Sequence, residues 1–221
     1  MSQHSIKSFS AALFKKPFYL AFINVLFLFK SPLEVLVRYV FEVGNYPKKF
    51  YVRTPLGLQS ATAFSHHDLI TFVECFGKLD YRASEDISVV VDFGSNIGLS
   101  ALYFLTRNQN VKVYMFEPVP RNIERLRKNL IGFEKRYELK KCAVGVEEGR
   151  FDFALDETGR YGGLQSDLTK TIQVEVLMAE EVISEILSKE GHIDILKIDV
   201  EGLEAAIIKS LSSKSLKKID R

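Results

Sequence analysis

An acid and two glycines that follow a run of apolar residues are the part of the sequence best suited to bind a ligand. Residues 89–93 predict a buried strand, residues 94–98 a tight turn, and the apolar spacing after them a helix. Gly94 and Gly98 allow a backbone to approach a ligand closely, and we expect the first amides of the following helix to be free to face a polar group. This order of strand, turn and helix is typical of a nucleotide site.

A second acid indicates which nucleotide. Glu117 follows a second apolar strand over 111–116, which places it to accept hydrogen bonds from both ribose hydroxyls of an adenosine. Asp92 stands just before the loop, where a carboxylate would repel a pyrophosphate but attract a cation. The loop also lacks the third glycine of the dinucleotide fingerprint. The pattern therefore favours S-adenosylmethionine, which carries an ammonium and a sulfonium, over a nicotinamide cofactor.

Two further acids follow a later apolar run. Residues 193–198 predict a strand covered on both faces, which delivers Asp199 and Glu201 to the carboxyl edge of the sheet. There they could orient an acceptor, bind a divalent cation or take a proton. Alternatively, these acids and Glu204 cap the next helix. The sequence does not decide metal dependence, and we assign no residue as a metal ligand.

Three segments together resemble a known family. Asp92–Gly98, Phe116–Asn122 and Lys197–Glu204 are similar to the three ordered motifs of FkbM-family S-adenosylmethionine-dependent methyltransferases, and the resemblance covers roughly residues 66–211. It implies a methyltransferase that acts on oxygen of a sugar, a glycan or a small natural product. By resemblance and position, the expected cofactor-binding residues are Asp92, Gly94, Ser95, Asn96, Gly98, Glu117, Pro118, Asn122 and Ala143. Asp199 and Glu201, with His67 as a weaker candidate, are expected to act on the acceptor.

The chain around these motifs predicts an α/β fold, a doubly wound and mostly parallel Rossmann-like methyltransferase sheet. Residues 137–144 predict its third strand, whose carboxyl end would place Ala143 beside the adenine or simply in the core. Residues 150–177 predict a hairpin-like insertion around a glycine-rich loop, with Tyr161, Gln165 and Ser166 on the acceptor side. A fifth strand should begin near 217–221, so the sheet is expected to lack its last strands.

The N-terminal 64 residues read as an accessory segment before a catalytic domain at 65–221. An apolar run at 18–29, flanked by basic residues, is shorter than the ~20 residues that span a bilayer. It predicts either a helix packed on the catalytic domain or in a dimer, or an interfacial helix at a membrane surface. A second helix from Pro32 to near Gly44, and a strand and turn at 50–58, follow. Ser65 predicts a helix start, where His66 and His67 are more typical of cap or surface residues than of a metal site.

Composition excludes several classes of protein. The 221 residues contain 47% hydrophobic residues, enough for one α/β domain and an accessory segment. A net charge of +2 from 30 basic and 28 acidic residues is nearly balanced, which argues against a nucleic-acid partner. Only Cys75 and Cys142 are present, and both are expected to be buried thiols. A cytoplasmic location follows from this, with contact at a membrane surface as the alternative.

Two other functional classes remain open. The chain could be a non-catalytic or partner-completed module that keeps the cofactor fold, in which case an exposed sheet edge and self-association are expected. It could also be a nicotinamide-dependent oxidoreductase on a similar sheet, which the missing glycine disfavours.

Overall fold

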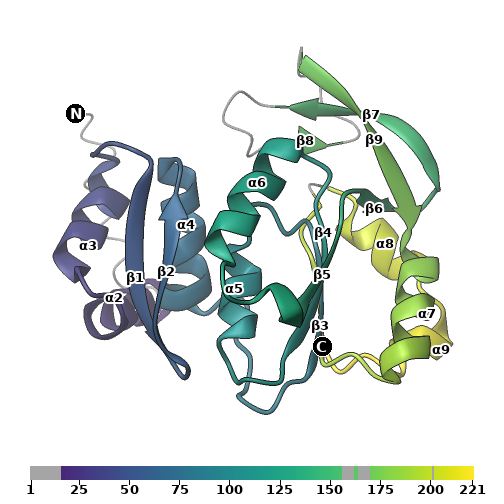
Figure 1. The fold of residues 1–221 in the computed structure, drawn as a ribbon, viewed down its shortest axis with the longest axis horizontal. Coiled ribbons are helices and arrows are strands. Elements are labelled where there is room, and N and C mark those ends of the chain that lie inside the picture. The colour runs from purple at the N-terminus through teal and green to yellow at the C-terminus, as the bar shows by residue number, and fades with distance from the viewer. Residues whose placement is uncertain (1–15, 156–161, 164–169, 201) are drawn as a thin grey trace. The chain divides into compact units, whose positions relative to one another are not determined.

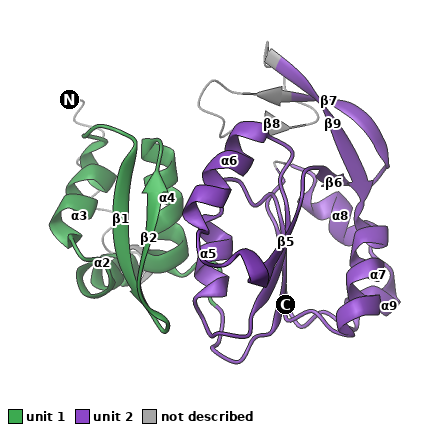
Figure 2. Ribbon diagram, viewed as in Figure 1, with its two compact units in different colours: residues 1–82 green, residues 83–221 purple. Residues whose placement is uncertain are grey.

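The computed structural model describes residues 16–155, 162–163, 170–200 and 202–221. It consists of two compact units, residues 1–82 and residues 83–221 (Figure 2). The sequence predicted a boundary between residues 64 and 65. The units divide later because the helix that begins at His66 packs on the N-terminal hairpin and helices.

The first unit combines helices with one β-hairpin. Its elements are α2 (Lys16–Leu28), α3 (Pro32–Phe41), β1 (Lys48–Thr54), β2 (Gly57–Ala63), α4 (His66–Val73) and the π-helical turn η1 (Glu74–Lys78). Strands β1 and β2 pair antiparallel, as the predicted strand and turn require. Its core includes an edge-to-face aromatic stack, in which the ring of Phe72 lies 5.2 Å from that of Phe29 and 5.0 Å from that of Phe76.

Local signals in the sequence set two of these helices. Pro32 opens α3, where its missing amide hydrogen costs nothing. Ser65 and Asp68 form a capping box at the start of α4, which confirms the predicted helix start and explains the polar run there. The predicted end of α3 near Gly44 is slightly late, because Glu42 already adopts the left-handed conformation that ends the helix.

The second unit carries the predicted α/β pattern. Its elements are β3 (Val89–Phe93), α5 (Leu99–Leu105), β4 (Lys112–Phe116), α6 (Pro120–Asn129), η2 (Glu134–Arg136), β5 (Tyr137–Lys140), β6 (Ala143–Gly145), β7 (Gly149–Leu155), β8 (Gly162–Gly163), β9 (Lys170–Met178), α7 (Ala179–Glu190), β10 (Ile195–Ile198), α8 (Glu204–Ser210) and α9 (Ser213–Leu216).

The main sheet of this unit is parallel and covered on both faces. Its strands lie in the order β10-β3-β4-β5, and every neighbouring pair is parallel. Helices α5 and α6 lie on one face and α7, α8 and α9 on the other (Figure 1). Strand β3 is buried along its whole length, as expected for a central parallel strand. The Rossmann-like α/β prediction is confirmed.

The predicted third strand is wrong in its second half. The chain pairs with β4 only over Tyr137–Lys140, bends at Lys141 and Cys142, and then enters a different sheet as β6. The apolar residues 142–144 read as a continuation of β5. They are apolar because they are buried. Cys142 and Val144 belong to the core between the main sheet and α7, and Ala143 packs with Val174 and Val176 of β9.

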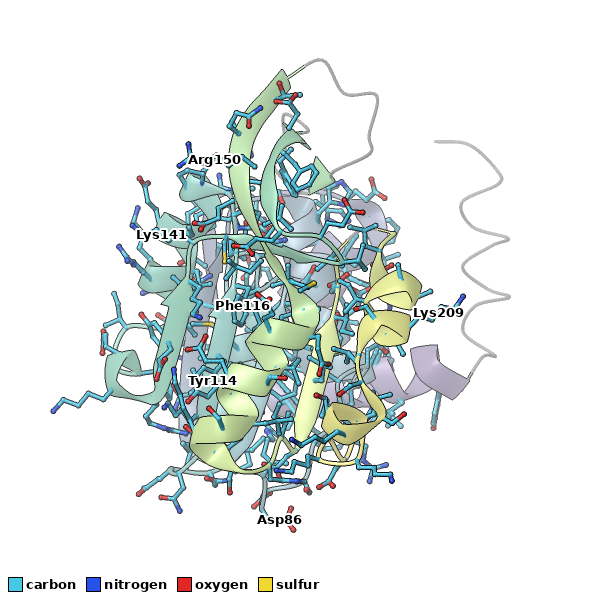
Figure 3. The ribbon with its side chains drawn as sticks, turned by 90° about the vertical axis from the view of Figure 1, so that its right-hand side faces the viewer. Asp86, Tyr114, Phe116, Lys141, Arg150 and Lys209 are labelled. Atoms are coloured by element: carbon cyan, nitrogen blue, oxygen red, sulfur yellow. The ribbon has the colours of Figure 1, made fainter. Side chains whose placement is uncertain are left out.

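The second sheet is the predicted hairpin insertion. Strands β7 and β9 pair antiparallel, and the order of the sheet is β6-β9-β7-β8. Figure 3 shows Tyr114, then Phe116, then Arg150 of β7 in one upward direction, so the carboxyl end of β4 points toward this sheet. The acceptor-side candidates Tyr161, Gln165 and Ser166 lie outside the described residues.

The last residues of the chain join the edge of the main sheet. Ile219 forms a parallel bridge with Ile193, and the backbone N–H of Leu196 donates to the Arg221 carbonyl. This is the position at which the sequence predicts a fifth strand. Both cysteines are buried free thiols, as predicted. In the described part of the chain, none of the helices combines the length and apolar character that crossing a membrane requires.

Candidate functional site

The predicted acids meet at the carboxyl edge of the main sheet. Asp92 is the last residue but one of β3, Glu117 follows β4, and Asp199 follows β10 on the other side of β3. The chain leaves β3 toward β4 and returns to the opposite side of β3 as β10, so the strand order reverses between β3 and β10. Open α/β sheets bind their ligands outside the carboxyl ends of the strands at such a point.

The amides of the loop after β3 are committed to internal bonds. Those of Gly94 and Ser95 both donate to the Phe116 carbonyl, at 3.0 and 3.1 Å, and that of Gly98 donates to the Ser95 carbonyl at 2.8 Å. The amide of Asn96 donates to Oε2 of Glu117 at 2.9 Å. The acceptors of these four loop amides are Phe116 at the end of β4, Glu117 just after it, and Ser95 of the loop itself. The expectation of free amides concerned the first residues of α5, which begins at Leu99, and it stays a prediction.

Contacts within the protein require glycine at positions 94 and 98, which the sequence alone did not indicate. Both lie at positive φ, 77° for Gly94 and 82° for Gly98. A Cβ on Gly94 would lie 2.0 Å from the backbone carbonyl oxygen of Asp199, and one on Gly98 would lie 3.0 Å from Cγ of Leu126 in α6. Gly94 thus lets the loops after β3 and β10 touch, and Gly98 lets α6 pack against the start of α5.

Asp92 and Lys197 form a buried ion pair beneath the loop. Parallel register sets these two residues side by side on β3 and β10, and Nζ of Lys197 lies 2.8 Å from Oδ1 of Asp92. The side chain of Lys197 is 4% exposed and that of Asp92 is 0% exposed. Nζ also donates to the Gly94 carbonyl at 3.0 Å and lies 3.5 Å from Oδ2 of Asp199, while Ser100 donates to Oδ2 of Asp92 at 2.6 Å. One cation therefore links the ends of both strands and the loop.

Lys197 is the residue that the motif analysis missed as a functional candidate. The available signal was a lysine inside an otherwise apolar strand, Ile195–Ile198, where a charged side chain must find a buried partner. Asp92 is that partner, so its carboxylate faces Lys197 and Ser100 and not the solvent.

Glu117 is buried at the end of β4. The residue is 4% exposed, and this burial raises the pKa of its carboxyl group to about 7. Hydrogen bonds from the amides of Val119 and Asn96 and from Nδ2 of Asn122, together with the charge of Lys197, oppose that rise in pKa. A carboxylate offers about four acceptor positions. Oε1 takes two of these bonds and Oε2 takes one, so Oε2 keeps room for another donor.

The residues expected to act on the acceptor belong to different elements of the fold. The side chain of Asp199 is 56% exposed at the edge, beside the buried ammonium of Lys197. Glu201 lies outside the described residues. Glu204 caps the loop before α8, since its carboxylate accepts from the amides of Val200 and Gly202. His67 belongs to the first unit, at the start of α4, and its role on the acceptor stays a prediction.

The remaining predicted cofactor residues fall into two groups. Pro118 and Asn122 lie beside Glu117, at the start of α6, and Ser95 lies in the loop, where its hydroxyl donates to the Asp92 carbonyl at 2.8 Å. Ala143 comes three residues after Lys140, which ends β5, and its role beside the adenine stays a prediction. It lies in β6, paired with Val176.

Metal-ligating side chains gather away from this edge. Within the described residues, His192, Asp194 and Asp220 bring ligand atoms within 4.8 Å of one another. They lie at the amino end of β10, and Oδ2 of Asp194 already accepts from the amides of Ser88 and Val89. This cluster ties chain segments together at the end of the sheet opposite Asp199.

Comparisons with known proteins agree with this architecture. A family model described as the methyltransferase FkbM domain matches residues 92–221, more than half of the chain. The sequence is 23% identical over 176 residues to Methyltransferase 1 of Beauveria bassiana, covering 70% of this chain and 69% of that protein. It is 29% identical over 150 residues to the 31-O-demethyl-FK506 methyltransferase FkbM of Streptomyces tacrolimicus, covering 54% of this chain and 58% of that one.

A solved structure is also similar. The crystal structure of Methyltransferase FkbM from Methylobacillus flagellatus matches with a TM-score of 0.39 and 18% identity, over 66% of this chain and 39% of the solved one. The chain thus spans between about two fifths and about two thirds of these proteins.

Proposed function

This chain belongs to the methyltransferase FkbM domain family, and we propose that it transfers the methyl group of S-adenosylmethionine to an oxygen of a sugar, glycan or small natural product. The observation that carries the proposal is the acidic carboxyl edge of the sheet at the reversal of strand order. There Glu117 and Asp199 flank the loop that follows Asp92. The Streptomyces relative is named for acting on an O-demethylated compound, which supports oxygen as the accepting atom.

The charge of this edge fits the proposed cofactor. Among the described residues that line this edge, the carboxyl groups of Asp92, Glu117 and Asp199 outnumber the ammonium of Lys197. A sulfonium ligand gains from such a surplus of acid, whereas a phosphate loses. The open acceptor position on Oε2 of Glu117 suits a ribose hydroxyl, and the loop from Gly94 would take the methionine end.

The loop amides argue against the nicotinamide alternative. A dinucleotide fold binds pyrophosphate against the backbone of the glycine-rich turn that follows the first strand, as well as at the start of the next helix. Here the amides of Gly94, Ser95, Asn96 and Gly98 already donate within the protein. A pyrophosphate at this loop would meet committed donors and nearby carboxylates.

In this proposal the chain orients the acceptor hydroxyl toward the methyl group and provides a group that accepts the hydroxyl proton. Bound S-adenosylmethionine would supply a methyl group activated on a sulfonium. Holding the acceptor hydroxyl in line with that methyl contributes roughly 7–11 kcal/mol of barrier reduction. Asp199 is the exposed carboxylate that takes the hydroxyl proton, a step that typically adds about 10²–10⁴ in rate. Lys197, 3.5 Å away, is a positioning residue that holds Asp199 at the edge.

Calorimetric titration with S-adenosylmethionine and S-adenosylhomocysteine tests the proposal. We expect binding to both and a loss of affinity in Glu117→Gln, while Glu124→Gln on the exposed face of α6 keeps the affinity. Absence of binding by folded protein would reject the cofactor assignment. Methylation of a panel of hydroxyl compounds with radiolabelled cofactor then tests the acceptor class. Binding without transfer would favour the non-catalytic module.

A further inference from the structure

The surface of the first unit is unusually apolar. Of the fourteen exposed large hydrophobic side chains among the described residues, eleven lie between residues 19 and 58, and only Ile131, Ile208 and Leu216 lie in the second unit. Single exposed apolar residues are common on soluble proteins, but a concentration of this kind marks a surface that contacts something apolar.

Two helices carry most of this surface. From Tyr19 onward, the exposed side chains of α2 are all apolar: Tyr19, Leu20, Phe22, Leu26 and Phe27, with Phe27 72% exposed. Residues of α3 at a spacing of four form a second stripe, Leu33, Val37 and Phe41, with Leu33 73% exposed. We call these two helix faces the apolar face.

The opposite side of α2 is packed into the unit. Ala21 and Val25 are buried and lie against Gly77 of η1, and Nδ2 of Asn24 donates to the Gly77 carbonyl at 2.7 Å. The helix is therefore fixed on the unit by one side, and only its outer side is available to a partner. A helix that is apolar on all sides is ordinarily covered on all sides.

The charge of residues 1–64 indicates the chemistry of the partner. Residues 1–64 contain eight basic and two acidic residues, a net charge of +6, and residues 65–221 contain 22 basic and 26 acidic residues, a net charge of −4. The exposed cations Lys49 and Arg53 alternate with exposed Tyr51 on the outward side of β1, and Lys30 lies 5.2 Å from the Tyr51 ring. Aromatic and apolar residues among lysine and arginine are the composition of an interfacial membrane surface.

We propose that the apolar face docks on a lipid bilayer that contains anionic headgroups. The apolar side chains would enter the boundary between headgroups and acyl chains, and the cations around Tyr51, namely Lys30, Lys49 and Arg53, would contact headgroup phosphates. A second copy of this chain is the other candidate to cover an apolar face. Its residues 1–64 would bring the same charge of +6 to the contact, which disfavours it.

Flotation of the full chain with phospholipid vesicles tests this proposal. We expect binding to phosphatidylcholine vesicles that contain phosphatidylglycerol, weak binding to phosphatidylcholine alone, and release as the salt concentration rises. Phe27→Ser should lower the partition coefficient at least about tenfold, because a fully buried aromatic side chain is lost from the contact. Ile131→Ser, which removes an equally exposed residue of the second unit, should leave it unchanged.

The charge contribution has its own pair of variants. Lys49→Glu should weaken binding to anionic vesicles by more than about fivefold, since each cation near the surface contributes about that factor. Lys141→Glu, an exposed lysine of the second unit, should have little effect. Leu33→Ser, on the second helix of the apolar face, should also weaken vesicle binding. A circular dichroism melt of every variant separates a loss of docking from a loss of folding.

Three results would overturn the proposal. They are absence of flotation with anionic vesicles by folded protein, equal effects of Phe27→Ser and Ile131→Ser, and a dimer in sedimentation velocity that Phe27→Ser dissociates. The last result would assign the apolar face to a second copy of the chain.

Discussion

Replacing Lys197 by methionine tests the buried ion pair on which the geometry of the edge depends. Methionine keeps most of the volume of the side chain but removes its charge. Three acceptors then lose a donor: Oδ1 of Asp92 at 2.8 Å, the Gly94 carbonyl at 3.0 Å and Oδ2 of Asp199 at 3.5 Å. Of the two carboxylates, only Asp199 can turn to water, because its side chain is 56% exposed.

The expected loss of stability follows from what remains around Asp92. Removing one partner of a buried ion pair typically costs about 3–5 kcal/mol, because the other charge stays buried. Asp92 keeps the hydrogen bond from Ser100 at 2.6 Å, which places our expectation at the lower end, about 3 kcal/mol. Since a domain of this size has about 5–15 kcal/mol in total, the loss should be readily measured.

Urea denaturation of the wild type and matched variants measures this cost. Lys140→Met is the control, because Nζ of Lys140 also lies 2.8 Å from a carboxylate, that of Glu185, but both side chains are more than 40% exposed. An exposed pair contributes only about 0–1 kcal/mol. Asp92→Asn combined with Lys197→Met should restore part of the stability, since no unpaired charge remains. A loss below about 1 kcal/mol for Lys197→Met, or equal losses for Lys197→Met and Lys140→Met, would refute the reasoning.

Three further predictions concern the edge itself. Burial raises the pKa of Glu117 from 4.5 to about 7, so between these pH values the folded state keeps a proton that the unfolded state has released. Wild-type stability should therefore fall as the pH rises from 4.5 to about 7. The side chain of Glu117→Gln does not titrate, so the stability of this variant should rise relative to wild type over that pH range. At 1.36 kcal/mol per unit of pKa, urea denaturation should show a relative gain of about 3 kcal/mol. Asp199→Asn should lower kcat by about 10²–10⁴ with cofactor affinity kept, whereas Asp86→Asn, at the far end of the unit in Figure 3, should leave kcat unchanged in a radiolabelled methyl-transfer assay. Gly94→Ala should be destabilised more than Gly132→Ala in thermal melts, because both glycines have positive φ but only a Cβ on Gly94 would meet another atom within 4 Å.

Each of these has a result that contradicts it. A constant stability difference between Glu117→Gln and wild type across the pH range would mean that the carboxyl group keeps its ordinary pKa in the fold. Full turnover in Asp199→Asn would assign proton removal to another group, such as His67. Equal destabilisation by Gly94→Ala and Gly132→Ala would show that the contact with the Asp199 carbonyl relaxes without cost.

The parts of the fold that follow from local sequence signals were predicted well. The segment Val89–Phe93 is apolar except for Asp92, because β3 is covered on both faces. Pro32 and Ser65 mark helix starts, Pro32 through its missing amide hydrogen and Ser65 through its side-chain cap. The acids at 92, 117 and 199 were predicted to meet because parallel strands bring their carboxyl ends to one edge, and they do. The break between β5 and β6 was missed, since a buried apolar residue has the same sequence signature in either sheet.

What the sequence could not supply is the partner of each group across the fold. The motif around Gly94 was interpreted as backbone that a ligand can approach, yet the Gly94 and Ser95 amides donate to Phe116 at the end of β4, and Gly94 lies against the carbonyl of Asp199, just after β10. Asp92 was interpreted as facing a cation of the cofactor, and the cation that it faces is Lys197. Both differences arise from the same register, which sets β4 and β10 on either side of β3. The motif residues therefore hold the loops of the edge together, and among the described residues Asp199 and the remaining acceptor position on Glu117 are additional groups that could meet a ligand there.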